Sequence, residues 1–559
     1  MKKTLILSIL TSMLLSNSLS SAASTENYEQ YQAAKRQDEQ QQKQIKAPSV
    51  TLQEDKQAED AEKIIALPKE PNRFRIKEFV IDSGKCKKFN WLVEKLEPYQ
   101  GRRVGAAGID MLVKLLSEEL MTKGYITTRI VVPEQELKTG ILRFQLLPGF
   151  VEDIRFTDEH KYGTWRTAFP LRPGDVLNIH DIEQGLEQMK RVVNQDANID
   201  IKAGTKPGYS IVLINVQRRK CWTAGMSIDD SGLQNTGRLQ ATGFFSLYNP
   251  TGLNDIFSYS YTKDAEKDDA LKGSKNTSFY YSVPYGNYTF NINRYYNEFY
   301  HEIPMEVPFE SRGKTTTWDF GVQKVIYRDR RRKTQLAAKI IKRRKENYVN
   351  GEEVKVQRLN TAAYQVGLMQ RQYVGQGMVD AFVYFQKGMP WFGAEPGLLD
   401  HQAGYMTTRY SLFGLNFYYG TPWQLGDVKA RYSFTFRGQY TGDVLYGSDH
   451  FSIGGRYTVR GFSGANTLAA ENGYILRNEV AFPLQKINLE PYLGLDYGRI
   501  WGPSDVNQPG NSLAGLALGL RGKIGKPMSY DVFMGMPIYK PKGFEAPKAV
   551  VGFSAYWQI

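Results

Sequence analysis

Cysteine and histidine are scarce in this chain of 559 residues, which contains two cysteines and five histidines. Cys86 and Cys221 lie far apart and in different predicted domains, which argues against a disulfide between them without deciding the matter. The histidines show none of the short spacings that are typical of metal ligands; they are His160, His180, His301, His401 and His450. We therefore predict no metal site.

Motifs of common enzymes are also absent from the sequence. It contains no Gly-x-Ser-x-Gly nucleophile elbow, no His-Glu-x-x-His zinc motif and no phosphate-binding glycine loop. An enzyme is therefore disfavoured, and we predict no catalytic residue and no cofactor.

Long apolar runs are confined to the N-terminus. Lys2 and Lys3 precede the apolar stretch 5–15, and the small residues 21–23 follow it, which is the pattern of a signal peptide over residues 1–23. After this segment no apolar run of about 18 residues occurs, so no membrane-spanning helix is expected. The chain is predicted to be exported.

The chain is basic, with a formal net charge of +14 and a pI near 9.3. Such a charge can indicate a nucleic-acid-binding protein. The composition favours another class, because 35 tyrosines, 28 phenylalanines and 51 glycines suit a transmembrane β-barrel with aromatic girdles and a polar lumen. No nucleic-acid partner is predicted.

Residues 24–47 are polar on every side. Acidic residues come early in this segment and basic residues late, an order that complements a helix dipole, and most of its residues are good helix formers. A helix that is polar all round is either solvated or housed in a polar cavity, and a disordered leader is the alternative. Residues 48–72 are charged and contain three prolines, which predicts a linker.

Residues 73–149 are predicted to form a compact α/β unit. Its expected elements are an alternating strand at 74–81, a helix at 109–120 that stops at Gly124, and strands at 125–132 and 141–147.

Residues 150–220 repeat this order. The expected elements are a strand at 151–156, a helix at 181–194, and strands at 199–201 and 209–216. Asp181 and Gln184 fit a variant of the capping box, and Val193 is expected to face inward with the other apolar residues of the helix. The alternative is that the two units are small modules that serve only as a spacer for the barrel.

From residue 221 to 559 the sequence becomes a series of alternating segments separated by turn residues. In 428–440, apolar residues alternate with lysine, arginine, serine and threonine, so the apolar face is expected to meet lipid and the polar face the lumen. At roughly 21 residues per strand and connection, this length predicts a barrel of about sixteen strands. The run from Val551 to Ile559 also alternates and is expected to close the barrel against its first strand.

One loop in this region carries an arginine between glycines. Val459, Arg460, Gly461 and Phe462 lie within 451–470, which has no regular periodicity and is expected to fold back on itself. About thirty residues later, strand alternation places Gly494, Asp496 and Gly498 on one face, so that a lone carboxylate lies between two missing side chains. We predict that Arg460 pairs with Asp496. A solvated arginine and an ordinary turn aspartate are the alternative.

The loop motif and the facing strand motif resemble those of the two-partner secretion transporters of the TpsB type, which belong to the BamA-related superfamily. The stretches 248–255 and 281–286 also resemble this family. The resemblance implies a mainly β protein: a 16-stranded transmembrane β-barrel, two periplasmic α/β POTRA domains (73–149 and 150–220) and a plug helix (24–47) that leaves the lumen during secretion. It also implies that the arginine-bearing loop folds into the lumen.

The function implied by this resemblance is secretion of a large exoprotein, namely a haemolysin, an adhesin or a contact-dependent inhibition toxin, across the bacterial outer membrane. The POTRA domains would recognise the exoprotein's N-terminal secretion domain, and no ATP would be used. The alternative within the superfamily is an insertase, although the main insertases carry more POTRA units. A passive porin would have no use for the periplasmic arm.

Two further partners are expected at the membrane. Outer-membrane lipid surrounds any such barrel, and the basic segment 328–333 either contacts lipopolysaccharide phosphates, contacts an acidic stretch of a partner on the periplasmic side, or forms a solvated turn. The final strand, Val551 to Ile559, resembles the C-terminal signal that the barrel assembly machinery recognises. Many such signals end in phenylalanine, whereas this chain ends in Ile559.

Overall fold

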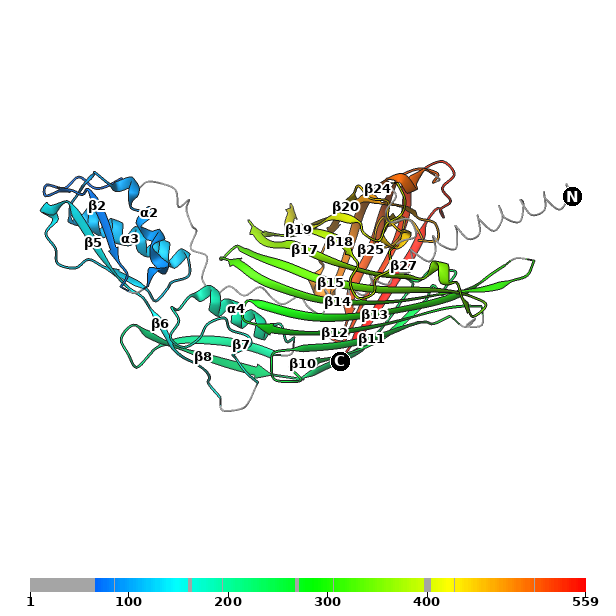
Figure 1. Ribbon diagram of the computed structural model, residues 1–559, viewed down its shortest axis with the longest axis horizontal. Helices are drawn as coiled ribbons and strands as arrows, with labels where there is room; N and C mark the ends of the chain where they lie inside the picture. Colours follow the sequence, from blue (N-terminus) through cyan, green and yellow to red (C-terminus); the bar gives the residue numbers. More distant parts are fainter. Residues whose placement is uncertain are drawn as a thin grey trace.

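The computed structural model describes residues 66–559 apart from 85, 159–162, 194, 267–270, 305, 397–403, 427 and 507. The predicted signal peptide (1–23), the predicted plug helix (24–47) and most of the predicted linker (48–72) lie outside the described residues. In the described part, two small α/β units precede a large barrel (Figure 1). No helix there is both long and apolar enough to span a membrane.

The first unit contains two small sheets and two α-helices. Strands β2 (Glu78–Asp82), β5 (Ile141–Leu147) and β4 (Arg129–Val131) form a sheet in that order, with β2 and β5 parallel. Its other elements are β1 (Phe74–Arg75), which pairs with β3 (Arg103–Val104), the helices α2 (Trp91–Glu94) and α3 (Ala106–Thr122), and the 3-10 turns η1 (Lys87–Phe89), η2 (Glu97–Tyr99) and η3 (Leu137–Thr139). The expected strand 74–81 is thus split into two.

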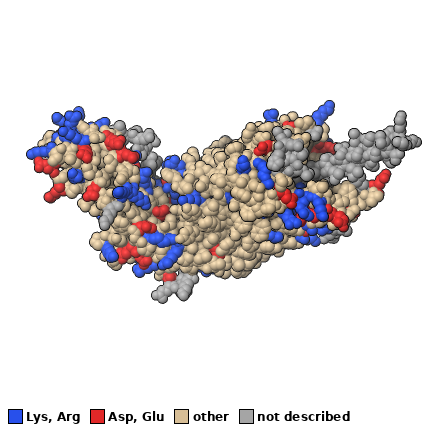
Figure 2. Space-filling model, in the orientation of Figure 1, with Lys and Arg blue, Asp and Glu red and all other residues tan. Residues whose placement is uncertain are grey.

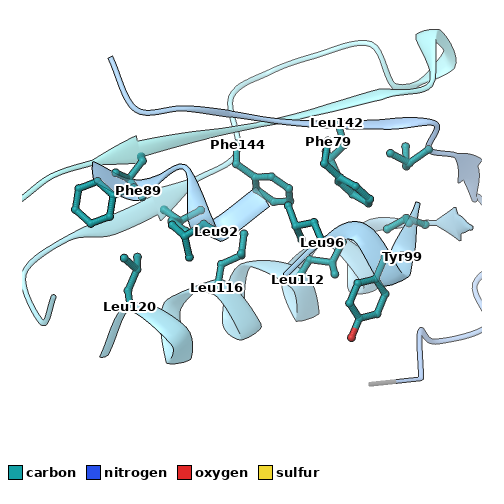
Figure 3. Close-up of a cluster of buried hydrophobic side chains, with 14 of the residues drawn as sticks. Phe79, Phe89, Leu92, Leu96, Tyr99, Leu112, Leu116, Leu120, Leu142 and Phe144 are labelled. Carbon is teal, nitrogen blue, oxygen red and sulfur yellow. The ribbon is translucent and has the colours of Figure 1, made fainter. Parts of the chain in front are cut away.

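The core of this unit lies between α3 and the sheet (Figure 3). Leu112, Leu116 and Leu120 are spaced four residues apart, so they share one face of α3 and are almost fully buried. Phe144 from the sheet packs against the same cluster. The helix ends before Gly124, whose φ of 89° suits a residue without a side chain.

The second unit repeats this sheet topology with strands β6 (Phe150–Phe156), β8 (Tyr209–Arg218) and β7 (Gln195–Ala203), in that order. Its helix α4 (Ile179–Lys190) starts two residues before the expected position. The capping-box prediction is wrong, because the side chain of Asn178 accepts the hydrogen bond from the backbone N–H of His180. The expectation for Val193 is also wrong: Val193 lies beyond the helix end and is exposed, whereas Val192 is buried against the barrel.

The barrel is closed and has sixteen main strands in the described part of the chain, which confirms the predicted number. They are β9 (Trp222–Asp229), β10 (Gln240–Tyr248), β11 (Ile256–Asp264), β12 (Lys272–Tyr285), β13 (Tyr288–Ile303), β14 (Phe309–Arg328), β15 (Arg332–Val349), β17 (Leu359–Val374), β18 (Gly377–Met389), β19 (Ser411–Leu425), β20 (Val428–Thr441), β23 (Asn472–Ala481), β24 (Leu489–Trp501), β25 (Ser512–Ile524), β26 (Met528–Tyr539) and β27 (Val550–Gln558). Each pairs antiparallel with its neighbours, and β27 closes the barrel against β9.

Several short elements lie in the connections of the barrel. They are β16 (Glu352–Glu353), which pairs with the end of β15, the hairpin strands β21 (Phe451–Ile453) and β22 (Leu468–Ala470), and the 3-10 turns η4 (Lys355–Gln357), η5 (Gly447–Asp449), η6 (Gln485–Ile487) and η7 (Pro503–Asp505).

The outer surface of the barrel follows the predicted alternation. Phe320, Leu336 and Val383 are among the large apolar side chains that are more than 40% exposed, an exposure that suits contact with lipid. Figure 2 shows a broad uncharged band on the visible face of the barrel, with charged side chains gathered at both ends. The band separates the end that carries the two α/β units from the opposite end.

Candidate functional site

The segment between β20 and β23 folds into the barrel interior. The short β21–β22 hairpin leads into a loop whose apolar side chains are almost completely buried. The loop and the barrel wall share one apolar cluster, made of Phe451, Ile453, Val459, Phe462, Leu468, Ala470, Ile475, Ile500, Leu513 and Phe544. Phe462 meets Phe544 edge to face, with ring centroids 5.8 Å apart. The loop is therefore packed like a protein core rather than solvated.

Arg460 lies at the tip of this loop and binds Asp496 on β24. The arginine Nε is 2.7 Å from Asp496 Oδ2, its Nη2 is 2.8 Å from Oδ1, and its backbone N–H donates to Oδ2 over 2.9 Å. Asp496 is fully buried and Arg460 is 4% exposed. The planar guanidinium matches both carboxylate oxygens at once, which is the strongest geometry for such a pair.

The neighbours of Asp496 on β24 fix the direction in which its side chain points. Leu493 and Leu495 are 44% and 51% exposed, so they face lipid. Asp496 lies on the other face of the strand and therefore points into the lumen.

Further charged residues surround this pair, and no sequence pattern pointed to them. Glu479 on β23 accepts a hydrogen bond from Arg460 Nη1 at 2.7 Å and another from Arg521 Nη2 at 2.6 Å. The Arg460 guanidinium also lies over the ring of Tyr492, 5.9 Å from its centroid. The arginine is thus shared between two carboxylates on neighbouring strands, and only strand pairing could have predicted that arrangement.

Glycines on the wall make room for the loop. A Cβ atom at Gly494 would collide with the Arg460 guanidinium, and one at Gly498 would lie 2.9 Å from Val459 Cγ2. Two glycines outside the predicted motif do the same, because a Cβ at Gly515 would collide with the carbonyl oxygen of Arg460 and one at Gly535 would lie 2.6 Å from the Gly461 nitrogen.

Gly461 is required by the backbone itself. Its φ is 114°, a conformation that residues with side chains rarely adopt. A Cβ there would also lie 2.6 Å from the carbonyl oxygen of Met536 on β26. The loop can thus turn at this point only with glycine.

The base of the loop is held by Glu471, between β22 and β23. Its carboxylate accepts a hydrogen bond from Ser504 Oγ at 2.6 Å and lies 3.5 Å from Nε2 of His450. Burial raises the pKa of Glu471, but the contacts with His450 and Ser504 outweigh that effect and hold the pKa at about 2. The residue is therefore ionised at neutral pH.

A second polar contact joins helix α4 to the rim of the barrel. Arg328, at the end of β14, binds Glu187 of α4 at 2.8 Å and lies 3.7 Å from Glu183. Lys333, at the start of β15, binds Glu187 as well. The side chains of Arg328 and Glu183 are 8% and 1% exposed.

This contact decides among the three expectations for segment 328–333. The segment lies at the end of the barrel that carries the α/β units. The predicted contact of this segment with lipopolysaccharide in the outer leaflet is therefore wrong. A fully solvated turn is wrong as well, because Arg328 and Lys333 are held by α4. The acidic stretch that it meets belongs to this chain itself.

Helix α4 also reaches the turns that the sequence singled out by resemblance. Arg191 donates to Ser282 Oγ at 2.9 Å and to the carbonyl oxygen of Asn254 at 3.3 Å. Gln188 donates to Thr289 Oγ1 at 3.1 Å. Both resembling stretches, 248–255 and 281–286, thus lie at the docking surface of α4.

The opposite end of α4 contacts the first α/β unit. The Asn178 side chain donates a hydrogen bond to the carbonyl oxygen of Lys123 over 2.9 Å. The backbone N–H of Ile179 donates to the carbonyl oxygen of Gly124, also over 2.9 Å. One helix therefore links the first unit, the second unit and the barrel rim.

Comparison with known proteins identifies the family. The model of the haemolysin secretion/activation proteins ShlB/FhaC/HecB matches residues 208–522, a ShlB-type POTRA model matches 74–149, and a second POTRA model matches 150–203. The chain belongs to the ShlB/FhaC/HecB family. Its barrel accordingly lies in the bacterial outer membrane, with the POTRA domains in the periplasm.

Individual relatives agree with this family. The chain is 37% identical over 551 residues to the outer membrane transporter CdiB-2 of Burkholderia pseudomallei, across 95% of this chain and 94% of the relative. It is 28% identical over 422 residues to the haemolysin transporter ShlB of Serratia marcescens, across 74% of each. The structure of CdiB from Acinetobacter baumannii shares the fold, with a TM-score of 0.85, 24% identity and coverage of 96% of this chain and 99% of that one.

Other candidate sites are few in the described part of this family member. No group of three or more His, Cys, Asp or Glu residues there is arranged to hold a metal ion. Cys86 and Cys221 are both free thiols, the first half-buried and the second exposed. The packed loop and the α4 contact are therefore the two features on which a functional proposal can rest.

Proposed function

We propose that this transporter carries one large exoprotein, a haemolysin, an adhesin or a contact-dependent inhibition toxin, through its barrel to the cell surface without ATP. The observation that carries the proposal is the buried Arg460–Asp496 pair, which holds a single loop against the inner wall of a closed barrel. Family membership and the two docked POTRA domains support it. Folding of the emerging exoprotein would supply the driving force.

Recognition of the exoprotein would begin in the periplasm. Each POTRA sheet ends in edge strands, β2 and β4 in the first and β6 and β7 in the second. An edge strand can pair with an extended peptide through backbone hydrogen bonds. Because α4 ties the second POTRA domain to the rim, a peptide added there would lie next to the barrel mouth.

Passage would then require the lumen to be clear. We infer that residues 24–47 form the plug and leave the lumen before the exoprotein enters. The Arg460 loop would stay docked on the wall and keep its own backbone out of the path. Residues Val459, Arg460, Gly461 and Phe462, with Gly494, Asp496 and Gly498, would therefore serve transport by holding one wall of the channel.

The proposal includes contacts with the membrane and its assembly machinery. Strand β27 ends in an alternating run that pairs with both β26 and β9. We infer that the run from Val551 to Ile559 is what the barrel assembly machinery recognises. Outer-membrane lipid and lipopolysaccharide would surround the finished barrel.

The experiment that tests the proposal is a paired proteomic comparison in the native cell, with and without this chain. Medium and cell surface are compared with the outer membrane. We expect one very large exoprotein to disappear from the surface and the medium while other barrels stay constant. A parallel fall of many outer-membrane barrels would instead identify an insertase and overturn the proposal.

A further inference from the structure

The outward face of the long strands β12–β15 changes character along its length. Outward residues of neighbouring strands lie side by side in rows, as the strand register fixes them. One row, Ile340–Phe320–Ile292, is apolar, and the rows beyond it are rich in basic and aromatic residues: Lys342–Trp318–Arg294–Phe279, then Arg344–Thr316–Tyr296–Thr277, then Glu346–Lys314–Glu298–Lys275, and then Tyr348–Arg312–Tyr300–Gly273.

These rows face outward because the alternate residues of the same strands point into the barrel. Thr315 and Lys345 are 7% and 9% exposed, and Arg343 binds Asp449 in the loop after β20. Leu336 and Phe320 lie on the same face of their strands as the basic rows, and they are 44% and 48% exposed. The six cations Lys275, Arg294, Arg312, Lys314, Lys342 and Arg344 are called the basic face below.

The basic face lies at the extracellular end of the barrel. Arg328 at the end of β14 contacts the periplasmic helix α4, and the turn at Gly286 between β12 and β13 faces the same helix. The basic rows occupy the opposite ends of these strands, beyond the apolar row. Figure 2, drawn in the orientation of Figure 1, shows charged side chains gathered at the end of the barrel away from the POTRA domains.

Acidic residues neutralise only part of the basic face. Glu298 is shared, because Lys275 lies 2.9 Å and Arg312 3.1 Å from its carboxylate, and Tyr296 donates a hydrogen bond to it. Arg344 pairs with Glu346. Among the described residues, Arg294, Lys314 and Lys342 have no carboxylate within 4 Å.

Aromatic rings hold two of these three cations in place. The guanidinium of Arg294 lies 5.6 Å from the ring centroid of Trp318, and the ammonium of Lys314 lies 4.6 Å from that of Tyr348. The third, Lys342, donates to the carbonyl oxygen of Phe392 over 2.8 Å. The three cations are therefore held in position without a directly bonded carboxylate among the described residues, which leaves them able to bind an anion.

We propose that the basic face binds the phosphate groups of a phosphorylated glycolipid of the outer leaflet, whose acyl chains lie on the apolar rows directly below. Three features select this ligand. The face is continuous with the lipid-facing surface, the guanidinium of Arg294 can bind two phosphate oxygens at once, and the aromatic rings occupy the level where a membrane meets water. The exoprotein is a poorer fit, because the face points away from the lumen. The inference rests on the outer-membrane location and not on exoprotein transport.

The test uses the full-length protein in detergent and measures binding of bisphosphorylated hexa-acyl lipid A by native mass spectrometry. The test variant carries Arg294→Gln, Lys314→Gln and Lys342→Gln. A matched control carries Lys324→Gln, Lys486→Gln and Lys526→Gln, which remove three positive charges at the periplasmic end. Heat-dependent migration in gels verifies that both barrels are folded.

We expect the test variant to bind lipid A at least about 10-fold more weakly, because it lacks three of the positive charges that would meet the phosphate groups. The control should bind like the wild type, and dephosphorylated lipid A should bind the wild type as weakly as lipid A binds the test variant. Equal affinity of the test variant and the wild type would overturn the proposal. So would an equal loss for phosphatidylglycerol, which would indicate a site for any anionic lipid. A dimer found for the wild type but not for the test variant would also overturn the proposal, because the basic face would then be an interface between copies of the chain. Secretion of the exoprotein is measured separately, so failure here leaves the proposed function untouched.

Discussion

Asp496 binds the side chain and the backbone of Arg460 at the same time. The two oxygens of the carboxylate accept hydrogen bonds from Nε, Nη2 and the backbone N–H of the arginine, all within 2.9 Å. One buried residue of the wall thus fixes both the position and the direction of the loop.

Replacing either partner should release the loop. In Arg460→Ala the buried Asp496 loses its main counter-charge and keeps only the more distant Arg477, 3.7 Å away. In Asp496→Ala the arginine loses its main acceptor, and we expect a cost of about 3–5 kcal/mol in each case. That cost would lower the docked population by about 100-fold or more. We expect secretion of the exoprotein to be abolished or strongly reduced, as measured by immunoblots of medium and cell surface, while the amount of barrel in the outer membrane stays largely unchanged.

The conservative variant Arg460→Lys sharpens this test. Lysine retains the charge but cannot bind both carboxylate oxygens and Glu479 at once. We expect secretion between that of the wild type and that of Arg460→Ala. Full secretion in both alanine variants would contradict a role of the pair in transport.

Filling the space behind the loop should have a similar effect without changing any charge. In Gly515→Ala the new methyl group collides with the carbonyl oxygen of Arg460, and backbone cannot move aside as a flexible side chain can. We expect a loss of secretion and a lower melting temperature of the purified barrel. Gly243→Ala on β10 is the matched control, since its methyl group would meet no atom within 4 Å. Equal effects of the two substitutions would show that a methyl group on any barrel strand is harmful.

Breaking the contact between α4 and the rim should free the POTRA domains. Arg328→Ala leaves Glu183 and Glu187 buried with less positive charge nearby, which should favour undocking. The native thiols Cys86 and Cys221 can carry spin labels, and we expect the distribution of distances between the labels to broaden. Glu118→Gln, which removes an exposed pair with Lys114 on α3, serves as the control and should change nothing. An unchanged distribution in Arg328→Ala would mean that other contacts suffice to dock α4.

The same contact should depend on pH. Burial raises the pKa of Glu187, but Lys333 and Arg328 outweigh that effect and hold the pKa below its ordinary value, which is about 4.3 in the undocked state. Because the pKa of Glu187 is lower in the docked state, its ionised carboxylate stabilises docking at any pH above the undocked pKa. This stabilisation is lost as the pH falls through the lower pKa of the docked state. The spin-label distances should therefore stay narrow at neutral pH and broaden in acid below about pH 4, with Glu187→Gln removing this dependence. A pH at which both proteins broaden equally would assign the change to another group.

Deleting residues 24–46 should open the channel. If this segment fills the lumen, single channels of the deletion variant in planar bilayers will conduct more ions than those of the full chain. A deletion of equal length within the linker is the control. Unchanged conductance would argue against a plug.

Local patterns in the sequence were sufficient for much of the fold and for the centre of the site. Period-two alternation assigns Asp496 and its flanking glycines to one strand face, and the length of the region 221–559, divided by the residues needed for one strand and its connection, predicts the number of barrel strands. The partners of Arg460 on other strands could not be predicted, because Glu479, Gly515 and Gly535 come together only through strand register across β23–β26.

The interpretations that failed did so for similar reasons. Asn178, whose backbone is extended, caps α4, so Asp181 three residues later lies in the first turn of the helix and is not its cap. Segment 328–333 resembles a solvated basic turn until the acidic face of α4, more than one hundred residues earlier in the chain, packs against it. Contacts between distant elements, and not local propensity, determined both outcomes.

The packing of the Arg460 loop also bears on the order in which the barrel assembles. The loop contacts β24, β25 and β26, all of which follow it within the last part of the chain, whereas closure joins β27 to β9 across nearly the whole barrel sequence. Contacts between residues near in sequence form at a lower entropic cost than contacts between distant ones. The C-terminal strands are therefore expected to fold around the loop as an early nucleus, and the pairing of β27 with β9 is expected to come last.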